Sequence, residues 1–309
     1  MAYFQNANDY AGAGGHGCGP RCGCASCQEK NLGLAEYYYE GEGRDEPRRG
    51  GAGARGLGEP APVLPAATQL TRVADASVPP WRAVCRIVAR QDAAGFSVGT
   101  GILVSPHHVL TAAHVIFPPQ APRTREIVVH PGQNGPDASS TGYKANGWAV
   151  SPRWRSTDCM TAGEDFGIIR LPVQHGFVPL IPFDPADLLR ALVTMAGYPS
   201  TREPAARHMF QSQGRVLGAI QINACTATTA EGRLIPTIPA TANLIAHNLN
   251  SEPSLSGGPL WFHKDTRRLA AIHTGTVANG TMRKAIILNG AVRAQIFDWM
   301  RRTLPPLRA

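Results

Sequence analysis

No stretch of about 18 consecutive apolar residues occurs in this chain, so a transmembrane helix is not expected. The first ten residues have neither a basic region nor an apolar core, so the sequence as written shows no ordinary secretory signal peptide. The formal net charge is +8, yet no helix-turn-helix, zinc-finger or basic-aromatic motif accompanies it. The positive charge therefore predicts solubility and attraction to acidic partners, and nucleic acid is not expected as a partner.

Aliphatic side chains are scarce in residues 1–62, where Gly, Arg, Pro and Glu dominate. Such a segment buries too little apolar surface to offset the entropy lost on ordering, so we predict a disordered tail or the pro-segment of a zymogen. The tail contains four closely spaced cysteines, Cys18, Cys22, Cys24 and Cys27. Their thiolates could bind zinc or a partner, form local disulfides or stay reduced. No second pair of ligands lies nearby, so neither a metal nor a cofactor is expected.

Residues 63–309 are predicted to form the folded domain. The chain contains 33 Gly and 26 Pro, and turns rich in both separate its short apolar runs. Residues 81–88 alternate between apolar and polar side chains, as a half-buried strand does, and similar short segments recur up to residue 288. This pattern favours an all-β barrel or sandwich.

The C-terminal end of the domain is predicted to be a helix over about residues 290–303. Asn289 can cap its first turn, and Val292, Ile296 and Trp299 recur near the helical spacing of 3.6 residues. Pro305 ends the pattern. The apolar stripe is expected to pack against the strands.

A serine followed by two glycines and a proline, Ser256, marks a tight turn before an apolar strand. A serine hydroxyl is a weak nucleophile at neutral pH and needs a base within hydrogen-bond reach. Ser251 and Ser254 compete for this role, and Ser256 is favoured because the Gly-Gly-Pro turn follows it. The turn is a weak signal on its own, and it gains weight from two residues upstream.

His114 and Asp165 precede Ser256 in the order His, Asp, Ser, which is one of the known orders of a catalytic triad. The histidine suits a general base because the ordinary pKa of an imidazole lies near working pH. The aspartate would orient the imidazole and stabilise its charged form. Glu164 and Asp158 compete for this role, and Asp165 is favoured because a buried carboxylate just before a strand needs a charged partner.

From about residue 79 to residue 302 the sequence resembles the chymotrypsin-fold, or trypsin-like, serine peptidases, and within them the bacterial glutamyl endopeptidases. Besides the Ser256 turn, the resemblance rests on LTAAHV at 110–115, EDFGIIRL at 164–171, AGYP at 196–199 and AIHTG at 271–275. It implies two six-stranded antiparallel β-barrels, at about 79–178 and 190–288. It also implies an acyl-enzyme mechanism, peptide or protein substrates, no cofactor, and a secreted or extracytoplasmic location.

The resemblance assigns the oxyanion hole to the backbone N–H groups of Ser254 and Ser256. The family normally has glycine where Ser254 stands. If this position needs a positive φ, a serine there adds strain of about 1–3 kcal/mol. Loss of one donor can lower the rate by about 10²–10³. The alternative function is therefore a catalytically weak or inactive peptidase-fold binding module.

The resemblance also assigns a substrate pocket to Asn250, Ser251, His273, Thr274 and Gly275. Trypsin-like peptidases that cleave after Arg or Lys have an aspartate at the position of Asn250, so such cleavage is not expected. His273 and the hydroxyl of Ser251 match residues with which glutamyl endopeptidases bind a substrate carboxylate. We therefore predict Glu, or Asp, at P1. A non-acidic P1 preference, with a local structural role for His273, is the alternative.

The domain contains three further cysteines and a pair of adjacent histidines. Cys85 lies in an alternating strand and is expected to be a buried apolar side chain. Cys159 and Cys225 could form one disulfide in an oxidising compartment, but the sequence does not establish their pairing. His107 and His108 follow a proline turn and are expected to face solvent.

Overall fold

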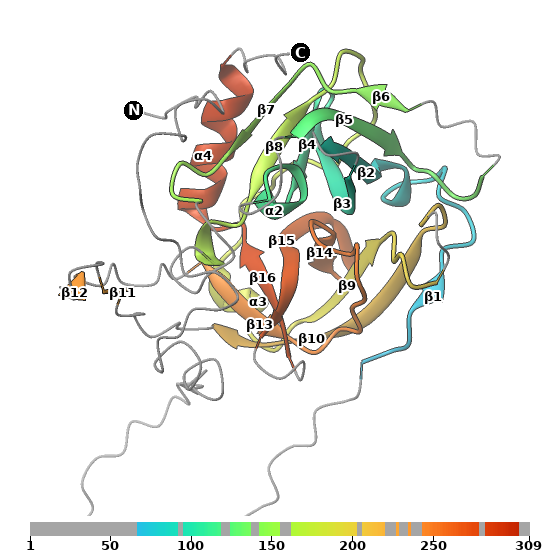
Figure 1. Cartoon of the computed structure of the whole chain (residues 1–309). Coiled ribbons are helices and arrows are strands. Elements are labelled where there is room, and N and C mark those ends of the chain that lie inside the picture. The colour runs from blue at the N-terminus through green and yellow to red at the C-terminus, as the bar shows by residue number, and fades with distance from the viewer. Residues whose placement is uncertain are drawn as a thin grey trace, which may run out of the picture.

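The computed structural model describes most of the chain beyond the N-terminal tail (Figure 1). The described residues are 67–91, 95–118, 124–136, 142–154, 162–202, 206–219, 227–228, 234–235, 243–277 and 282–302. The predictions for the tail and its four cysteines, for Asp158, and for the pairing of Cys159 with Cys225 lie outside this set. In the described part of the chain, no helix is long and apolar enough to cross a membrane.

The first sheet, at the top of Figure 1, has seven strands in the order β6-β5-β2-β3-β4-β8-β7. Every neighbouring pair in it is antiparallel. The sheet curls because the apolar side chains of its central strands, such as Ile87 and Ile102, turn inward and are fully buried. Its strands are β2 (Val84–Gln91), β3 (Phe96–Ser105), β4 (His108–Thr111), β5 (Thr124–Pro131), β6 (Tyr143–Lys144), β7 (Gly147–Val150) and β8 (Gly167–Arg170).

The second sheet closes on itself. Its strand order is β1-β10-β13-β16-β15-β14-β9, and β10 also pairs with β9, so six strands form a barrel and β1 extends it at one edge. The strands are β1 (Thr71–Arg72), β9 (Leu192–Gly197), β10 (Phe210–Ala219), β13 (Leu244–His247), β14 (Pro259–Phe262), β15 (Asp265–Val277) and β16 (Met282–Ile287). A separate pair is formed by β11 (Ala227–Thr228) and β12 (Leu234–Ile235). The predicted all-β architecture is confirmed. Of the two predicted six-stranded barrels, the described residues form one closed barrel, whereas the first sheet has seven strands and remains a curled half-barrel, because its end strands β6 and β7 do not pair with one another.

The predicted C-terminal helix is also confirmed, as α4 (Gly290–Arg301). The side-chain oxygen of Asn289 accepts the N–H of Val292 at 3.0 Å and so caps the first turn. The ring of Trp299 lies 5.5 Å from that of Phe166, which anchors the helix beside the segment that precedes β8. The other helical segments are short: η1 (Trp81–Ala83), α2 (Ala113–Ile116), η2 (Ala162–Glu164) and α3 (Pro185–Leu188).

Buried side chains join the two sheets. The ring of Trp81, before β2, lies 5.3 Å from that of Trp261 on β14. The hydroxyl of Tyr198, which follows β9, donates to the carbonyl oxygen of Val84 at 3.2 Å. These contacts fix the two sheets relative to one another, and the candidate site residues lie where the sheets meet.

Two sequence predictions can be tested against burial. Cys85 is fully buried in β2, as expected, and burial raises the pKa of its thiol. The prediction that His108 faces solvent is wrong, because β4 lies inside the sheet and buries the imidazole. Its Nδ1 is 2.7 Å from Ser105 Oγ. Burial, with a smaller effect from the charges of Arg170 and His107, lowers the pKa of His108 to about 4.

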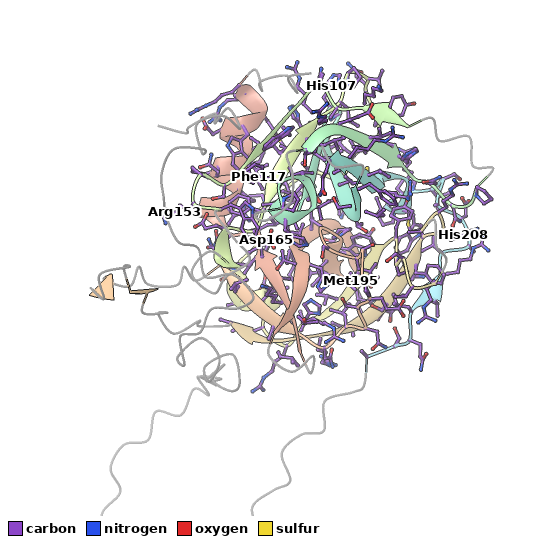
Figure 2. The ribbon with its side chains drawn as sticks, in the orientation of Figure 1. His107, Phe117, Arg153, Asp165, Met195 and His208 are labelled. Carbon is purple, nitrogen blue, oxygen red and sulfur yellow. The ribbon has the colours of Figure 1, made fainter. Side chains whose placement is uncertain are left out.

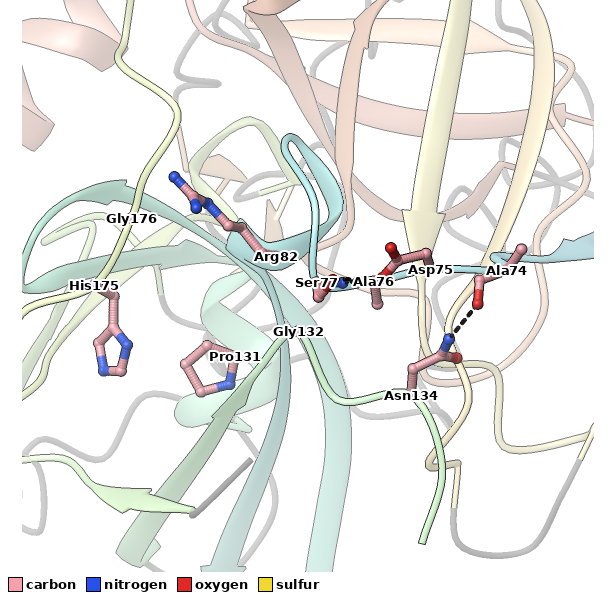
Figure 3. Close-up of a pocket in the computed structure, with 10 residues that line it drawn as sticks. All are labelled: Ala74, Asp75, Ala76, Ser77, Arg82, Pro131, Gly132, Asn134, His175 and Gly176. Carbon is pink, nitrogen blue, oxygen red and sulfur yellow. Dashed lines mark hydrogen bonds between the residues drawn. The ribbon is translucent and has the colours of Figure 1, made fainter. Parts of the chain in front are cut away.

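A hollow of about 500 Å³ lies beside the first sheet, away from the candidate site (Figure 3). Asp75, Arg82, Asn134 and His175 are among its lining residues. The carboxylate of Asp75 accepts the backbone N–H of Ser77 at 2.8 Å, and this hydrogen bond orders the segment on one side of the hollow. No candidate catalytic or substrate-binding residue lines it, so it plays no part in the site described below.

Candidate active site

His114 and Asp165 lie side by side at the ends of two paired strands. Strand β4 runs antiparallel to β8 with Thr111 opposite Gly167, so the segment that follows β4 lies beside the segment that precedes β8. His114 Nδ1 donates to Asp165 Oδ2 at 2.7 Å, and the backbone N–H of His114 donates to Oδ1 at 3.0 Å. Asp165 is 2% exposed, whereas the His114 side chain is 25% exposed. The buried carboxylate therefore fixes the tautomer and leaves Nε2 free to accept a proton.

Figure 2 shows Asp165 at the junction of the two sheets. The competing carboxylate, Glu164, has other partners: it accepts a hydrogen bond from Ser151 Oγ and lies 3.9 Å from the guanidinium of Arg153. Asp165 is thus the carboxylate that contacts His114.

The turn that carries Ser256 is pressed against the first sheet. The N–H of Thr100 donates to the carbonyl oxygen of Ser256 at 2.8 Å. Gly257 has a φ of +84°, and a Cβ there would lie 2.0 Å from Thr100 O and 2.2 Å from Thr111 Oγ1, so only glycine fits. Because Thr111 ends the strand that leads to His114, this close approach brings Ser256 to the histidine segment.

Among the described residues, the hydroxyl of Ser256 makes no hydrogen bond to His114. Hydrogen bonds between a nucleophile and its base are often long without substrate and tighten only in the substrate complex. The segments of His114, Asp165 and Ser256 therefore meet at one place, without a hydrogen bond between Ser256 and His114.

Ser254 is the third residue of a tight turn, 252–255, whose second residue is a proline. The N–H of the last residue donates to the carbonyl of the first at 3.2 Å, and Ser254 has a φ of +73°. These features match a type II turn, in which this position favours glycine. In the described part of the chain, the N–H groups of Ser254 and Ser256 have no hydrogen-bond partner. The nucleophile turn therefore carries two free backbone donors, one at Ser254 and one at Ser256.

A row of three side chains runs inward from the predicted pocket. Ser251 Oγ lies 2.7 Å from His273 Nε2, and His273 Nδ1 lies 3.1 Å from His247 Nε2. His273 is 1% exposed and His247 is fully buried. Burial is the main cause that lowers the pKa of His273 to about 3, with smaller electrostatic effects from His114 and from the cations of Arg283 and Lys284. Burial also holds the pKa of His247 well below its usual range, so both imidazoles are neutral.

Comparison with known proteins identifies the family. The family model described as "Trypsin-like peptidase domain" matches residues 99–272, which is more than half of the chain. The chain belongs to the trypsin-like peptidase family. A search of curated protein sequences gives no match.

Solved structures show the same fold at low identity. A Glu endopeptidase in complex with MPD is 17% identical with a TM-score of 0.59, over 75% of this chain and 97% of that one. A protease of M. tuberculosis in its active form is 20% identical with a TM-score of 0.51, over 82% and 96%. A scabies mite inactivated protease paralogue is 15% identical with a TM-score of 0.52, over 72% and 95%. The all-β fold of this trypsin-like peptidase is therefore chymotrypsin-like.

The structure places the other predicted pocket residues of this trypsin-like peptidase in different ways. The side chain of Asn250 is exposed and donates to the carbonyl of Thr68 at 2.8 Å, so it binds the segment before β1. Thr274 is 4% exposed, and its hydroxyl has no hydrogen-bond partner among the described residues. Gly275 has a φ of +134°, and a Cβ there would lie 3.6 Å from Lys284 Cε. Thr274 and Gly275 thus share β15 with His273, and the Lys284 side chain lies beside Gly275.

Two important residues escaped the sequence prediction. Thr100 accepts the N–H of Tyr198 at 3.1 Å and donates to the carbonyl of Ser254 at 2.9 Å, across 154 residues of chain. His247 contacts His273 from a neighbouring part of the barrel. A threonine and a histidine in apolar strands have no spacing signal that marks such contacts, and only the fold brings them together.

Proposed function

We propose that this protein is a serine endopeptidase that cleaves peptide bonds through an acyl-enzyme and favours Glu, or Asp, at P1. The observation that carries the proposal is the hydrogen-bonded pair of His114 and Asp165 beside the Ser256 turn. The free N–H groups of Ser254 and Ser256 add two hydrogen-bond donors for a developing oxyanion. Together they supply a nucleophile, a base, an orienting acid and two donors.

In acylation, Ser256 Oγ attacks the scissile carbonyl carbon while His114 Nε2 takes the hydroxyl proton. The carbonyl electron pair moves to oxygen, where the N–H groups of Ser254 and Ser256 stabilise the negative charge. Asp165 stabilises the imidazolium. The intermediate then expels the amine, which takes the proton from His114, and an ester to Ser256 remains. Water, deprotonated by the same imidazole, hydrolyses that ester and restores the serine.

The pocket supports an acidic P1 side chain. If His247 Nε2–H donates to His273 Nδ1, the proton of His273 is on Nε2, directed at Ser251. A substrate carboxylate could then accept one hydrogen bond from this N–H and one from the Ser251 hydroxyl. The positive charges of Arg283 and Lys284, which disfavour a charged His273, favour an anion at the same place.

Covalent labelling with a fluorophosphonate probe tests the activity. We expect labelling and peptide hydrolysis by the wild type, none by Ser256→Ala, and normal levels in the matched control Ser77→Ala, which lies outside the site. Hydrolysis that survives in Ser256→Ala, or a wild type with neither reaction, would refute the proposed mechanism.

A panel of fluorogenic peptides that differ only at P1 tests the specificity. We expect the largest kcat/KM with Glu, then Asp, and a loss of about 10-fold or more with the uncharged isostere Gln. Ser251→Ala should lower kcat/KM for Glu more than for Gln. Fastest turnover after Phe, Leu or Arg would overturn the acidic preference while leaving the peptidase mechanism intact.

The second candidate is a peptidase-fold binding module. It is favoured by the serine at position 254 and by the open contact between Ser256 and His114. An inactivated paralogue with the same fold is among the similar structures. Absence of Ser256-dependent labelling in the wild type, with a folded protein by circular dichroism, would favour this function over the first.

A further inference from the structure

The turn that carries the Ser254 N–H is held by hydrogen bonds and an ion pair from the loop that follows β9. The guanidinium of Arg202 contacts both carboxylate oxygens of Glu252, with Nη2 to Oε1 at 2.5 Å and Nε to Oε2 at 3.1 Å. Thr201 Oγ1 donates to Oε2 as well. A forked guanidinium–carboxylate pair fixes orientation as well as distance. Glu252, the first residue of the turn, is therefore held in one position.

A third residue of the loop, Ser200, binds the Pro253–Ser254 peptide, which carries the Ser254 N–H. The backbone N–H of Ser200 donates to the carbonyl oxygen of Pro253 at 3.1 Å. That oxygen belongs to the same planar peptide as the Ser254 N–H, and in a trans peptide the two point in opposite directions. By binding the oxygen on one side, Ser200 aims the N–H to the other side. We call Ser200, Thr201, Arg202 and Glu252 the oxyanion clamp.

The clamp acts against the conformational preference of a serine. The turn 252–255 is type II, and a flip of its central peptide, Pro253–Ser254, would convert it to type I. Type I gives the third residue a negative φ, which suits serine, whereas type II holds Ser254 at +73°. The flip would also turn the Ser254 N–H away from its present direction. Serine thus favours the conformation in which one oxyanion donor is lost.

The sequence around the turn has one acidic side chain, and Arg202 is the cation that binds it. Glu252 is the only acidic residue between positions 232 and 264, and the residue before the nucleophile is the buried, apolar Leu255. Arg202 therefore contacts the one carboxylate in this stretch of the sequence.

We propose that Arg202 and Glu252 are positioning residues that hold the Pro253–Ser254 peptide in its oxyanion-binding orientation. The proposal rests on the peptidase function given above. It explains how this chain keeps the required turn with serine in place of glycine. The clamp stabilises the type II turn through contacts from outside it, whereas a glycine would stabilise the same turn through its own tolerance of a positive φ.

The test combines Arg202→Met with Ser254→Gly. Glycine removes the preference for type I, so it should make the clamp dispensable. We expect Arg202→Met to lower kcat about 10-fold with KM within about twofold, because an oxyanion donor acts in the transition state. In the Ser254→Gly background the same change should lower kcat by less than about twofold. A merely structural role of Arg202 would give equal losses in both backgrounds.

Two further arms complete the design. Arg267→Met, which removes the exposed ion pair with Asp265 at 3.5 Å, is the matched control and should leave kcat unchanged. The exchange Arg202→Glu with Glu252→Arg should recover part of the activity lost in either single variant. No loss in Arg202→Met, or an equal loss in both backgrounds, would overturn the proposal.

A crystal structure of Arg202→Met separates this inference from the proposed function, because it needs no activity. We expect the Pro253 carbonyl rotated away from Ser200 and a negative φ at Ser254. A turn that keeps its type II form in this variant would refute the clamp even if the protein is an active peptidase. A flipped turn in a protein without Ser256-dependent labelling would support the clamp and refute the peptidase function.

Discussion

The side-chain hydroxyl of Thr100 donates a hydrogen bond to the carbonyl oxygen of Ser254 at 2.9 Å, from the first sheet to the turn before the nucleophile. The Thr100 hydroxyl oxygen also accepts the N–H of Tyr198 at 3.1 Å, and Thr100 is fully buried. One side chain therefore joins the nucleophile turn, the first sheet and the end of β9.

Replacing Thr100 with valine keeps its shape and removes these bonds. The carbonyl of Ser254 and the N–H of Tyr198 would lose their partner, at a cost of about 1–3 kcal/mol for each buried group. We expect urea unfolding to show a loss of about 2 kcal/mol or more, together with a lower kcat. Thr100→Ser retains the hydroxyl and should stay near the wild type. Equal losses in both variants would mean that the methyl group, and not the hydroxyl, is what matters.

Ser254→Gly should stabilise the protein slightly. A non-glycine residue in the left-handed region costs about 1–2 kcal/mol, and glycine returns about 0.5–1 kcal/mol of that as lost chain entropy. The expected net gain in the free energy of unfolding is up to about 1 kcal/mol. Because φ is already +73° with serine, kcat should change little. A rise in kcat of about 100-fold would show instead that serine spoils the oxyanion hole.

The sequence indicates candidate residues for the site but not the contacts that support them. Ser256, His114 and Asp165 are candidates because each lies in a short local pattern and the three occur in a known order. The contacts of Thr100 with Ser254 and of Arg202 with Glu252 join residues 154 and 50 positions apart. No local periodicity encodes such pairs, because they depend on how the two sheets close. His108 was mispredicted for the same reason: a turn precedes it, but its strand lies inside the sheet.

Lys284→Met should weaken the preference for an acidic P1 residue. The lysine side chain lies beside Gly275 on the pocket strand, and its charge acts on His273. Removing a cation near a bound carboxylate should lower kcat/KM for Glu peptides by about 3- to 10-fold and leave Gln peptides unchanged. The Glu/Gln ratio measures this directly, with Arg267→Met as a charge-matched control. If both substrates lose equally, the lysine has a structural role.

Stability should fall as the pH drops from about 6.5 toward 4, and His108 should contribute. Its pKa is lowered to about 4 in the fold, so the neutral form is preferred there, while the unfolded chain binds the proton at higher pH. The contribution is therefore present above the unfolded pKa and is lost as the pH falls through this range. Urea unfolding at several pH values should give a shallower dependence for His108→Gln, by up to about one proton. An unchanged slope would contradict the assignment.

Asp165→Asn should lower kcat by about 10⁴-fold with little change in KM. An asparagine can no longer hold the Nδ1–H tautomer with a charged acceptor, nor stabilise the imidazolium that forms during attack. Glu164→Gln is the matched control, one residue away, because that carboxylate contacts Ser151 and Arg153 and not His114. Its kcat should stay within about threefold of the wild type. If Glu164→Gln proved the more damaging change, the orienting acid would be reassigned, since the two variants remove the same charge from adjacent positions.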